Sequence, residues 1–294
     1  MTAKLMNFRT IAIYVLLAGA VSAHAQSVTT ATWIGPASGG EWNTPQYWDT
    51  GAPPLDPTTN AFIGFNTNVS YNFQMTPERF GQLILHGVLN VNAPGFNCSS
   101  NLMIRAGGGN RLFINSGGVM DVTGNFIFTS NASVTINPGG VLNVGGELMV
   151  GSGITPPGYT GGGTAGASGW MTNNGGTIRA SATTINRANS SASSLLLING
   201  GTNDLGAVTI RRSVAGGTAP GLGTEGLVIS NGLVRMTSLD LGGPNGNSWL
   251  TLLLVDGTVT NTGDFIVRQI TPGRASRFVQ TGGLFVSTGS GGVN

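Results

Sequence analysis

The chain has 294 residues, of which 49 are glycine and only 8% are charged. Charged residues make up about a quarter of an ordinary globular domain, so this is not the composition of a typical soluble enzyme. Intrinsic disorder is excluded because 40% of the residues are hydrophobic and the formal net charge is only +2. Collagen is excluded because glycine occupies one position in six rather than one in three.

The first 25 residues have the layout of a secretory signal peptide. Two basic residues precede an apolar run from Ile11 to Val21, which ends in the small-residue sequence Ala23-His24-Ala25. We expect cleavage between Ala25 and Gln26, and hence an exported protein that is extracellular or lies on the outer cell surface. The apolar run is too short to span a membrane, and no later run reaches that length.

Removal of the signal also removes Lys4, the only lysine, and Arg9. The mature chain then has 11 arginines against 11 acidic residues, so its net charge is zero and nucleic-acid binding loses its electrostatic basis. Cys98 is the only cysteine, which excludes an intramolecular disulfide. His86 is the only histidine left and precedes a turn glycine, where we expect a structural or surface role. We therefore expect no metal, no cofactor and no catalytic triad.

Behind loops of unequal length, the chain carries a repeat of short strands. Successive anchor glycines are separated by 22 to 36 residues, and most intervals are close to 25. The residues four before, two after and nine after each anchor form three columns, in which 21 of 24 positions are apolar. Leu197, in the first column, is therefore expected in the core. The anchors are Gly87, Gly118, Gly140, Gly176, Gly201, Gly232, Gly257 and Gly283.

The repeat predicts a stack of strands rather than helices. Short β-branched runs are interrupted by glycine, asparagine and proline, and no helical period is sustained. One unit cannot bury its apolar face alone, whereas units stacked at roughly 4.8 Å bury a continuous core. We predict an all-β fold, a right-handed parallel β-helix (β-solenoid) of about eight rungs, with a β-sandwich or propeller as the alternative. An asparagine ladder is possible at the turns, through Asn115, Asn137, Asn174, Asn199 and Asn231.

Two regions follow the signal peptide in this prediction. Residues 26–80 form an N-terminal cap with the first strands, and residues 81–294 form the solenoid, whose last repeat is expected to be truncated at the C-terminus. Trp33, Trp42 and Trp48 lie in the cap region. An open solenoid end exposes apolar core and strand edges, so these rings are expected to cover the first rung. The alternative is a platform on which sugar rings stack.

Several phrases resemble a known family of repeats. Thr32-Trp33-Ile34-Gly35, Gly40-Glu41-Trp42-Asn43, Trp48 and Ala61-Phe62-Ile63-Gly64 are similar to the start of exported bacterial proteins with autotransporter-associated β-strand repeats. The segment Ile136-Asn-Pro-Gly-Gly-Val-Leu-Asn-Val144 is similar to the repeats themselves. The resemblance implies a passenger-like β-helix at the cell surface or in the medium, and it transfers no catalytic residue. Residues 1–294 contain neither a C-terminal barrel nor a sorting signal, which departs from the family pattern.

Charged residues at repeated positions are the candidate sites. Asp240 and Asp264 lie eight and seven residues past their anchors, so they are candidates for an acidic pair of the kind that polysaccharide enzymes use. The alternative is a polar residue at the exit of a turn. Arg187, Arg212 and Arg268 each lie eleven residues past an anchor. They are expected to form a solvated edge that blocks aggregation or a site for an anion or acidic sugar.

The sequence favours a structural or adhesive role at the cell surface without catalysis. The alternatives are a carbohydrate-active β-helix enzyme, either a lyase or a glycoside hydrolase, and a non-catalytic glycan-binding module. Surface glycans or other cell-surface components are the expected partners. Insertions are expected to project along one edge of the solenoid, where repeat proteins often bind; they include Asn97–Arg111, Ser152–Gly169 and Ala215–Gly226. The alternative is that they are flexible loops without a partner.

Overall fold

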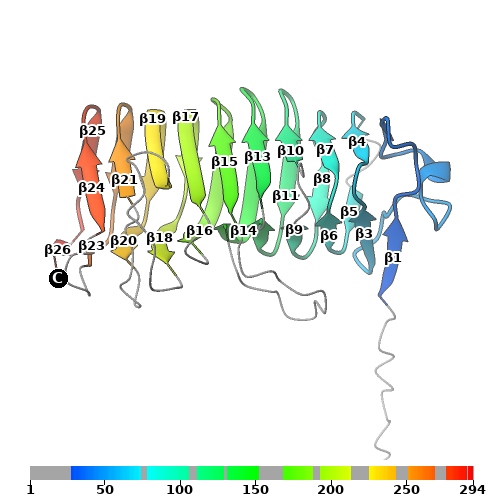
Figure 1. Ribbon diagram of the computed structural model, residues 1–294, viewed down its shortest axis with the longest axis horizontal. Helices are drawn as coiled ribbons and strands as arrows, with labels where there is room; N and C mark the ends of the chain where they lie inside the picture. The colour runs from blue at the N-terminus through cyan, green and yellow to red at the C-terminus, as the bar shows by residue number, and fades with distance from the viewer. Residues whose placement is uncertain are drawn as a thin grey trace, which may run out of the picture.

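A computed structural model describes residues 28–73, 78–105, 111–128, 131–151, 168–187, 193–212, 225–242, 251–268, 276–289 and 291–293. The strands stack side by side along one axis, from β1 at the N-terminal end to β26 at the other (Figure 1). Neighbouring strands pair in parallel along the whole stack. The predicted all-β parallel β-solenoid is therefore confirmed.

Each turn of the solenoid contributes strands to three faces, here named A, B and C in chain order. Face A contains β1 (Thr29–Thr32), β3 (Thr59–Ile63), β6 (Leu83–Leu85), β9 (Leu102–Ile104), β12 (Phe126–Phe128), the second parts of β14 (Val141–Val150) and β16 (Thr177–Arg187), β18 (Ala207–Arg212), β20 (Ser238–Gly242), β23 (Phe265–Val267) and β26 (Gly291–Val293).

Faces B and C are built in the same way. Face B contains β2 (Gly40–Glu41), β4 (Asn68–Tyr71), β7 (Val88–Val91), β10 (Arg111–Ile114), β13 (Ala132–Ile136), β15 (Gly169–Asn173), the first parts of β17 (Ser194–Asp204) and β19 (Gly226–Met236), β21 (Thr251–Leu254) and β24 (Arg277–Gln280). Face C contains β5 (Glu78–Phe80), β8 (Phe96–Cys98), β11 (Val119–Val122), the first parts of β14 and β16, the second parts of β17 and β19, β22 (Thr258–Asn261) and β25 (Leu284–Ser287).

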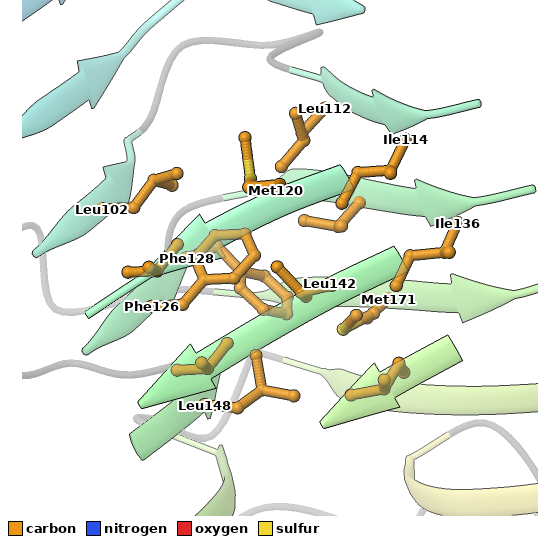
Figure 2. Close-up of a cluster of buried hydrophobic side chains, with 14 of the residues drawn as sticks. Leu102, Leu112, Ile114, Met120, Phe126, Phe128, Ile136, Leu142, Leu148 and Met171 are labelled. Carbon is orange, nitrogen blue, oxygen red and sulfur yellow. The ribbon is translucent and has the colours of Figure 1, made fainter. Parts of the chain in front are cut away.

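The core fills the space between the three faces. Along each strand, side chains alternate between the interior and the outer surface, as the period of two in a β-strand requires. In β13, for example, Val134 and Ile136 are buried while Ser133 and Thr135 are only half-buried. Figure 2 shows side chains of successive turns meeting inside the solenoid, among them Leu102, Leu112, Ile114, Met120, Phe126, Phe128, Ile136, Leu142, Leu148 and Met171.

The second of the three predicted columns is correct over seven turns. The residues two after the anchor are register partners on face C, and all except Phe285 are fully buried: Met120, Leu142, Ile178, Asn203, Val234, Val259 and Phe285. The anchor Gly87 is an exception, because it lies one corner earlier than the others. It lies between faces A and B, whereas the other anchors lie between B and C, and Phe96 rather than Leu89 is the partner of Met120.

The first predicted column needs a larger correction. Four residues lie between Ile136 and Val141. In the next turn, only three residues lie between their register partners, Asn173 and Thr177. A shift of one residue transfers every side chain to the opposite surface of a strand. Residues four before the anchor therefore point inward at Ile114 and Ile136 but outward at Leu197, which is half-buried.

The third column mixes inner and outer residues for a similar reason. Met149 is the register partner of Thr184, not of Ile185, so Ile127 and Met149 belong to the outer row of face A while Ile185 and Ile210 point inward. The proposed insertion Asn97–Arg111 is also wrong, because it contains β9, a regular strand of face A. Ser152–Gly169 and Ala215–Gly226 fall largely outside the described residues; both connect a face A strand to a face B strand.

Asparagine side chains line the corner between faces B and C. The Nδ2 group of Asn115 donates to Oδ1 of Asn92, and that of Asn137 donates to Oδ1 of Asn115 at 2.7 Å. A further link joins Asn199 to Asn174 at 3.1 Å. The expected ladder is thus present in two separate runs. Asn231 instead accepts a bond from the backbone of Gly232 at its own turn.

Candidate functional site: the outer faces of the solenoid

The three tryptophans of the N-terminal region form an aromatic plug at the end of the core. Trp42 and Trp48 pack edge to face with centroids 4.7 Å apart, and Trp33 contacts Trp48 at 5.4 Å. The Nε1 group of Trp48 donates to the carbonyl of Trp42 at 2.8 Å, and Trp42 also meets Phe96 of the solenoid. Their exposures are 4%, 0% and 1% for Trp33, Trp42 and Trp48. The proposal of a sugar platform on these rings is therefore corrected, because stacking requires an exposed ring face.

This plug is held by irregular structure between β1 and β3. The 3-10 helix η1 (Pro45–Tyr47) has Pro45 in its first turn and turns the chain so that Trp48 can bridge back to Trp33. The ring of Tyr47 packs on Trp33 at 5.3 Å. These contacts cover the first turn with apolar rings, as an open solenoid end requires.

The two candidate acids do not form a pair. Asp240 is the register partner of Ile266, while the carbonyl of Asp264 accepts from the amide of Leu239, so the two aspartates are offset along the strands. Asp240 instead forms a forked ion pair with Arg268, through Nε at 3.0 Å and Nη2 at 3.1 Å. These hydrogen bonds, together with the charge of Asp240, raise the pKa of Arg268 above its ordinary value.

The three candidate arginines do not form one column. Arg187 and Arg212 are register partners in β16 and β18, as the spacing predicts, and their side chains lie outside the description. Arg268 aligns instead with Gly242 and Arg211, one residue out of that row. The predicted signal cleavage between Ala25 and Gln26 lies outside the described residues.

Two titratable side chains are partly or fully removed from water. Cys98 points into the core with 1% exposure, and this burial raises the pKa of its thiol to about 11. His86 packs between the rings of Phe62 and Phe65, with centroids 5.3 and 4.6 Å away. Burial, and then the charge of Arg105, lower the pKa of His86 below its ordinary value. Burial therefore favours the neutral form of both side chains.

The outer surface of face C carries an unbroken row of polar side chains. Side chains within it bond to one another: Asn143 donates to Asp121 at 2.7 Å, Arg179 donates to Asn143 at 3.1 Å, and Arg235 pairs with Asp204 at 3.0 Å. Each position is the register partner of the next, in the order Arg79, Asn97, Asp121, Asn143, Arg179, Asp204, Arg235 and Thr260.

A pocket of about 390 Å³ lies at the N-terminal end of this row. Its lining comes from three successive strands, β5, β8 and β11, and from the residues that follow two of them: Arg79, Asn97, Ser99, Asp121 and Thr123. All five are polar or charged. None of them was a candidate in the sequence, because the three columns were chosen for apolar residues and these positions lie between them.

The outer surface of face B differs from that of face C. In its later turns the outward row is apolar, with Leu197, Val228, Leu253 and Val279 as register partners, and Trp170 is 37% exposed in a neighbouring row. This apolar outer row explains why the first predicted column looked like core. Apolar residues occur on both sides of these strands, so hydrophobicity did not reveal the change of register.

The fold and its outer faces define the chain as a parallel β-solenoid with a plugged N-terminal end. No family model matches the chain, and neither a curated protein nor a solved structure matches it significantly. Among the residues that the structure describes, no His, Cys, Asp and Glu side chains gather into a group that could hold a metal ion. Within the same ranges, no helix is long and apolar enough to cross a membrane.

Proposed function

We propose that the protein is an exported β-solenoid that acts as a structural or adhesive module at the cell surface. The observation that carries the proposal is the outer row of face C, in which charged and amide side chains of successive turns are register partners. Hydrogen bonds join Asp121, Asn143 and Arg179, and an ion pair joins Asp204 and Arg235. Such a row gives a long, hydrated and chemically regular surface. A rigid surface of this kind suits contact with an extended partner, because loops and faces on a rigid scaffold are where recognition usually resides.

The arrangement of the candidate acids supports a binding role over hydrolysis. Glycosidases hold two carboxyl groups facing one another at a fixed separation across the scissile bond. Asp240 is engaged by Arg268, and Asp264 is offset from it along the neighbouring strand. The N-terminal sequence supports export through the layout of its basic residues and its apolar run.

Adhesion is tested with the full chain expressed in a bacterial host that carries out export. The expected product in the medium or on the outer surface begins at Gln26, which mass spectrometry of the N-terminal peptide measures. Beads coated with this product are expected to bind to cells or to extracted surface polysaccharide, whereas beads coated with heat-unfolded product are not. Equal retention of both kinds of bead contradicts an adhesive role for the fold.

The rival enzymatic function is tested on the same material. Neutral and acidic polysaccharides are incubated with the protein, and release of reducing ends or unsaturated products is measured. Depolymerisation that disappears in the Asp240→Ala, Asp264→Ala double variant would overturn the proposal in favour of a carbohydrate-active enzyme. An unchanged chain length in every polysaccharide is the expected result.

A further inference from the structure

We infer that the pocket on face C, lined by Arg79, Asn97, Ser99, Asp121 and Thr123, binds a neutral oligosaccharide that runs along the solenoid axis. This inference rests on the proposed function and names the chemistry of the partner. It concerns residues that no column of the repeat singled out.

The first support is that the internal bonding of the outer row does not extend N-terminal of Asp121. Hydrogen bonds join Asp121, Asn143 and Arg179, and an ion pair joins Asp204 and Arg235. Among the described residues, neither the guanidinium of Arg79 nor the amide of Asn97 has a side-chain partner. Both line the pocket, so their hydrogen-bonding groups are free for a ligand.

The second support is the chemistry of the lining. Arg79 offers only donors, Asp121 offers only acceptors, and Asn97 and Thr123 offer both. Sugar hydroxyls are donors and acceptors at once, so a saccharide can use all four. The lining holds no apolar side chain. A protein partner would need aromatic or apolar anchors in a desolvated centre, which this pocket does not provide.

The third support is charge and geometry. One arginine and one aspartate leave the pocket without net charge, which favours a neutral ligand over an anionic one. The lining residues belong to three successive strands, so they repeat at roughly 4.8 Å along the axis. A chain of linked sugar rings placed along that direction presents hydroxyl groups to each strand in turn. One side chain of the pocket lining is already held in place, because Ser99 Oγ donates to the carbonyl of Phe80 at 2.7 Å.

The test is isothermal titration of the full mature chain with neutral hexasaccharides of glucose, mannose and N-acetylglucosamine, and with hexagalacturonate as the anionic probe. At least one neutral hexasaccharide is expected to bind. Arg79→Ala is expected to weaken that binding at least tenfold, and Asn97→Ala to weaken it as well. Arg79 is exposed, so its removal leaves the core intact, which a circular dichroism melt verifies.

The matched control is Arg277→Ala. Arg277 is an exposed arginine of β24 on face B, so it lies outside both the outer row of face C and the pocket. Its loss is expected to change the affinity less than twofold. Failure of every neutral probe at millimolar concentration, tighter binding of hexagalacturonate, or equal effects of the two arginine variants would each overturn the inference.

The outcomes also separate this inference from the proposed function. If beads coated with Arg79→Ala still adhere and no saccharide binds, the saccharide site is refuted and the adhesive role stands. If saccharide binding depends on Arg79 but the beads do not adhere, the saccharide site is supported and the adhesive role is refuted.

Discussion

At the scale of single residues, orientation on a strand decides what a side chain contributes. Leu196 and Leu197 are adjacent in β17 and chemically identical, yet Leu196 is fully buried while Leu197 lies on the outer surface of face B. The two positions offer a direct measurement of the register, because the same substitution meets the core at one and water at the other.

Leu196→Asp is expected to lower the free energy of unfolding by at least about 4 kcal/mol, because it loses apolar burial and places an unpaired carboxylate in the core. Leu197→Asp is expected to cost about 1 kcal/mol, as surface substitutions usually do. Urea denaturation followed by circular dichroism measures both. A larger loss at Leu197 than at Leu196 would refute the register of β17.

Cys98 gives the fold a dependence on alkaline pH. Burial raises the pKa of its thiol from 9.0 to about 11, so the folded state favours the neutral thiol. Above pH 9 ionisation of Cys98 lowers the free energy of the unfolded chain but not that of the folded chain. Stability present below pH 9 is therefore lost as the pH rises toward 11, by up to about 3 kcal/mol.

This loss is measured as the difference between wild type and Cys98→Ala in urea denaturation at several pH values. Ionisation of any other group in this pH range occurs in both proteins and cancels in the difference. The advantage of wild type over the variant is expected to shrink above pH 9. A difference that stays constant from pH 7 to 11 would show that the thiol is exposed to water.

At the scale of the element, corners rather than strands set the register. The corner between faces B and C takes four residues after Ile114 and after Ile136, and three residues from Asn173 onward. Glycine is required there for two reasons. Gly201 has φ +75°, and a Cβ atom on it would lie 1.8 Å from the carbonyl oxygen of Gly176 in the previous turn.

Gly201→Ala is expected to cost about 2–5 kcal/mol, since it combines left-handed backbone strain with overlap of the neighbouring turn. Gly51→Ala separates the two effects. Gly51 has φ +73° but nothing within 4 Å of its ideal Cβ, so only the backbone strain of about 1–2 kcal/mol is expected. Thermal melts of both variants measure the difference. Equal losses would show that the turns are not in close contact at Gly201.

At the scale of the whole molecule, length variation is confined mainly to one corner of the solenoid. The link from β12 to β13 on the way from face A to face B needs only residues 129–131, whereas the equivalent link from β14 to β15 takes residues 151–168. Each turn contacts only its neighbours, so the corner can lengthen without disturbing the stack.

Deletion of residues 153–166 is therefore expected to preserve the solenoid, because four remaining residues exceed the shortest link of this corner and shortening a long loop costs little. The measurement is the far-ultraviolet circular dichroism spectrum with a thermal melt, and the expected midpoint lies within a few degrees of wild type. Loss of the β-sheet signal would place these residues in the core. Weaker bead adhesion with an intact fold would place a contact of the partner there.

Much of the fold could be predicted from the sequence because its main determinants are local. Glycine-centred turns at regular intervals and β-branched runs between them allow few structures other than stacked strands. The column Met120, Leu142 and Ile178 was correct because each member lies two residues after its anchor, and the change in corner length falls before the anchor. Trp33, Trp42 and Trp48 were correctly expected to cover the end of the core for their size and their position before the first repeat.

Only the tertiary structure decided which side of each strand faces the core. The corner before Thr177 is one residue shorter, which reverses the orientation of Thr172 and Leu197, and the apolar outer row of face B concealed the reversal. The pocket at Arg79, Asn97 and Asp121 was hidden for the same physical reason. Its residues are separated by about twenty positions in the sequence, and they meet only because the turns stack in register.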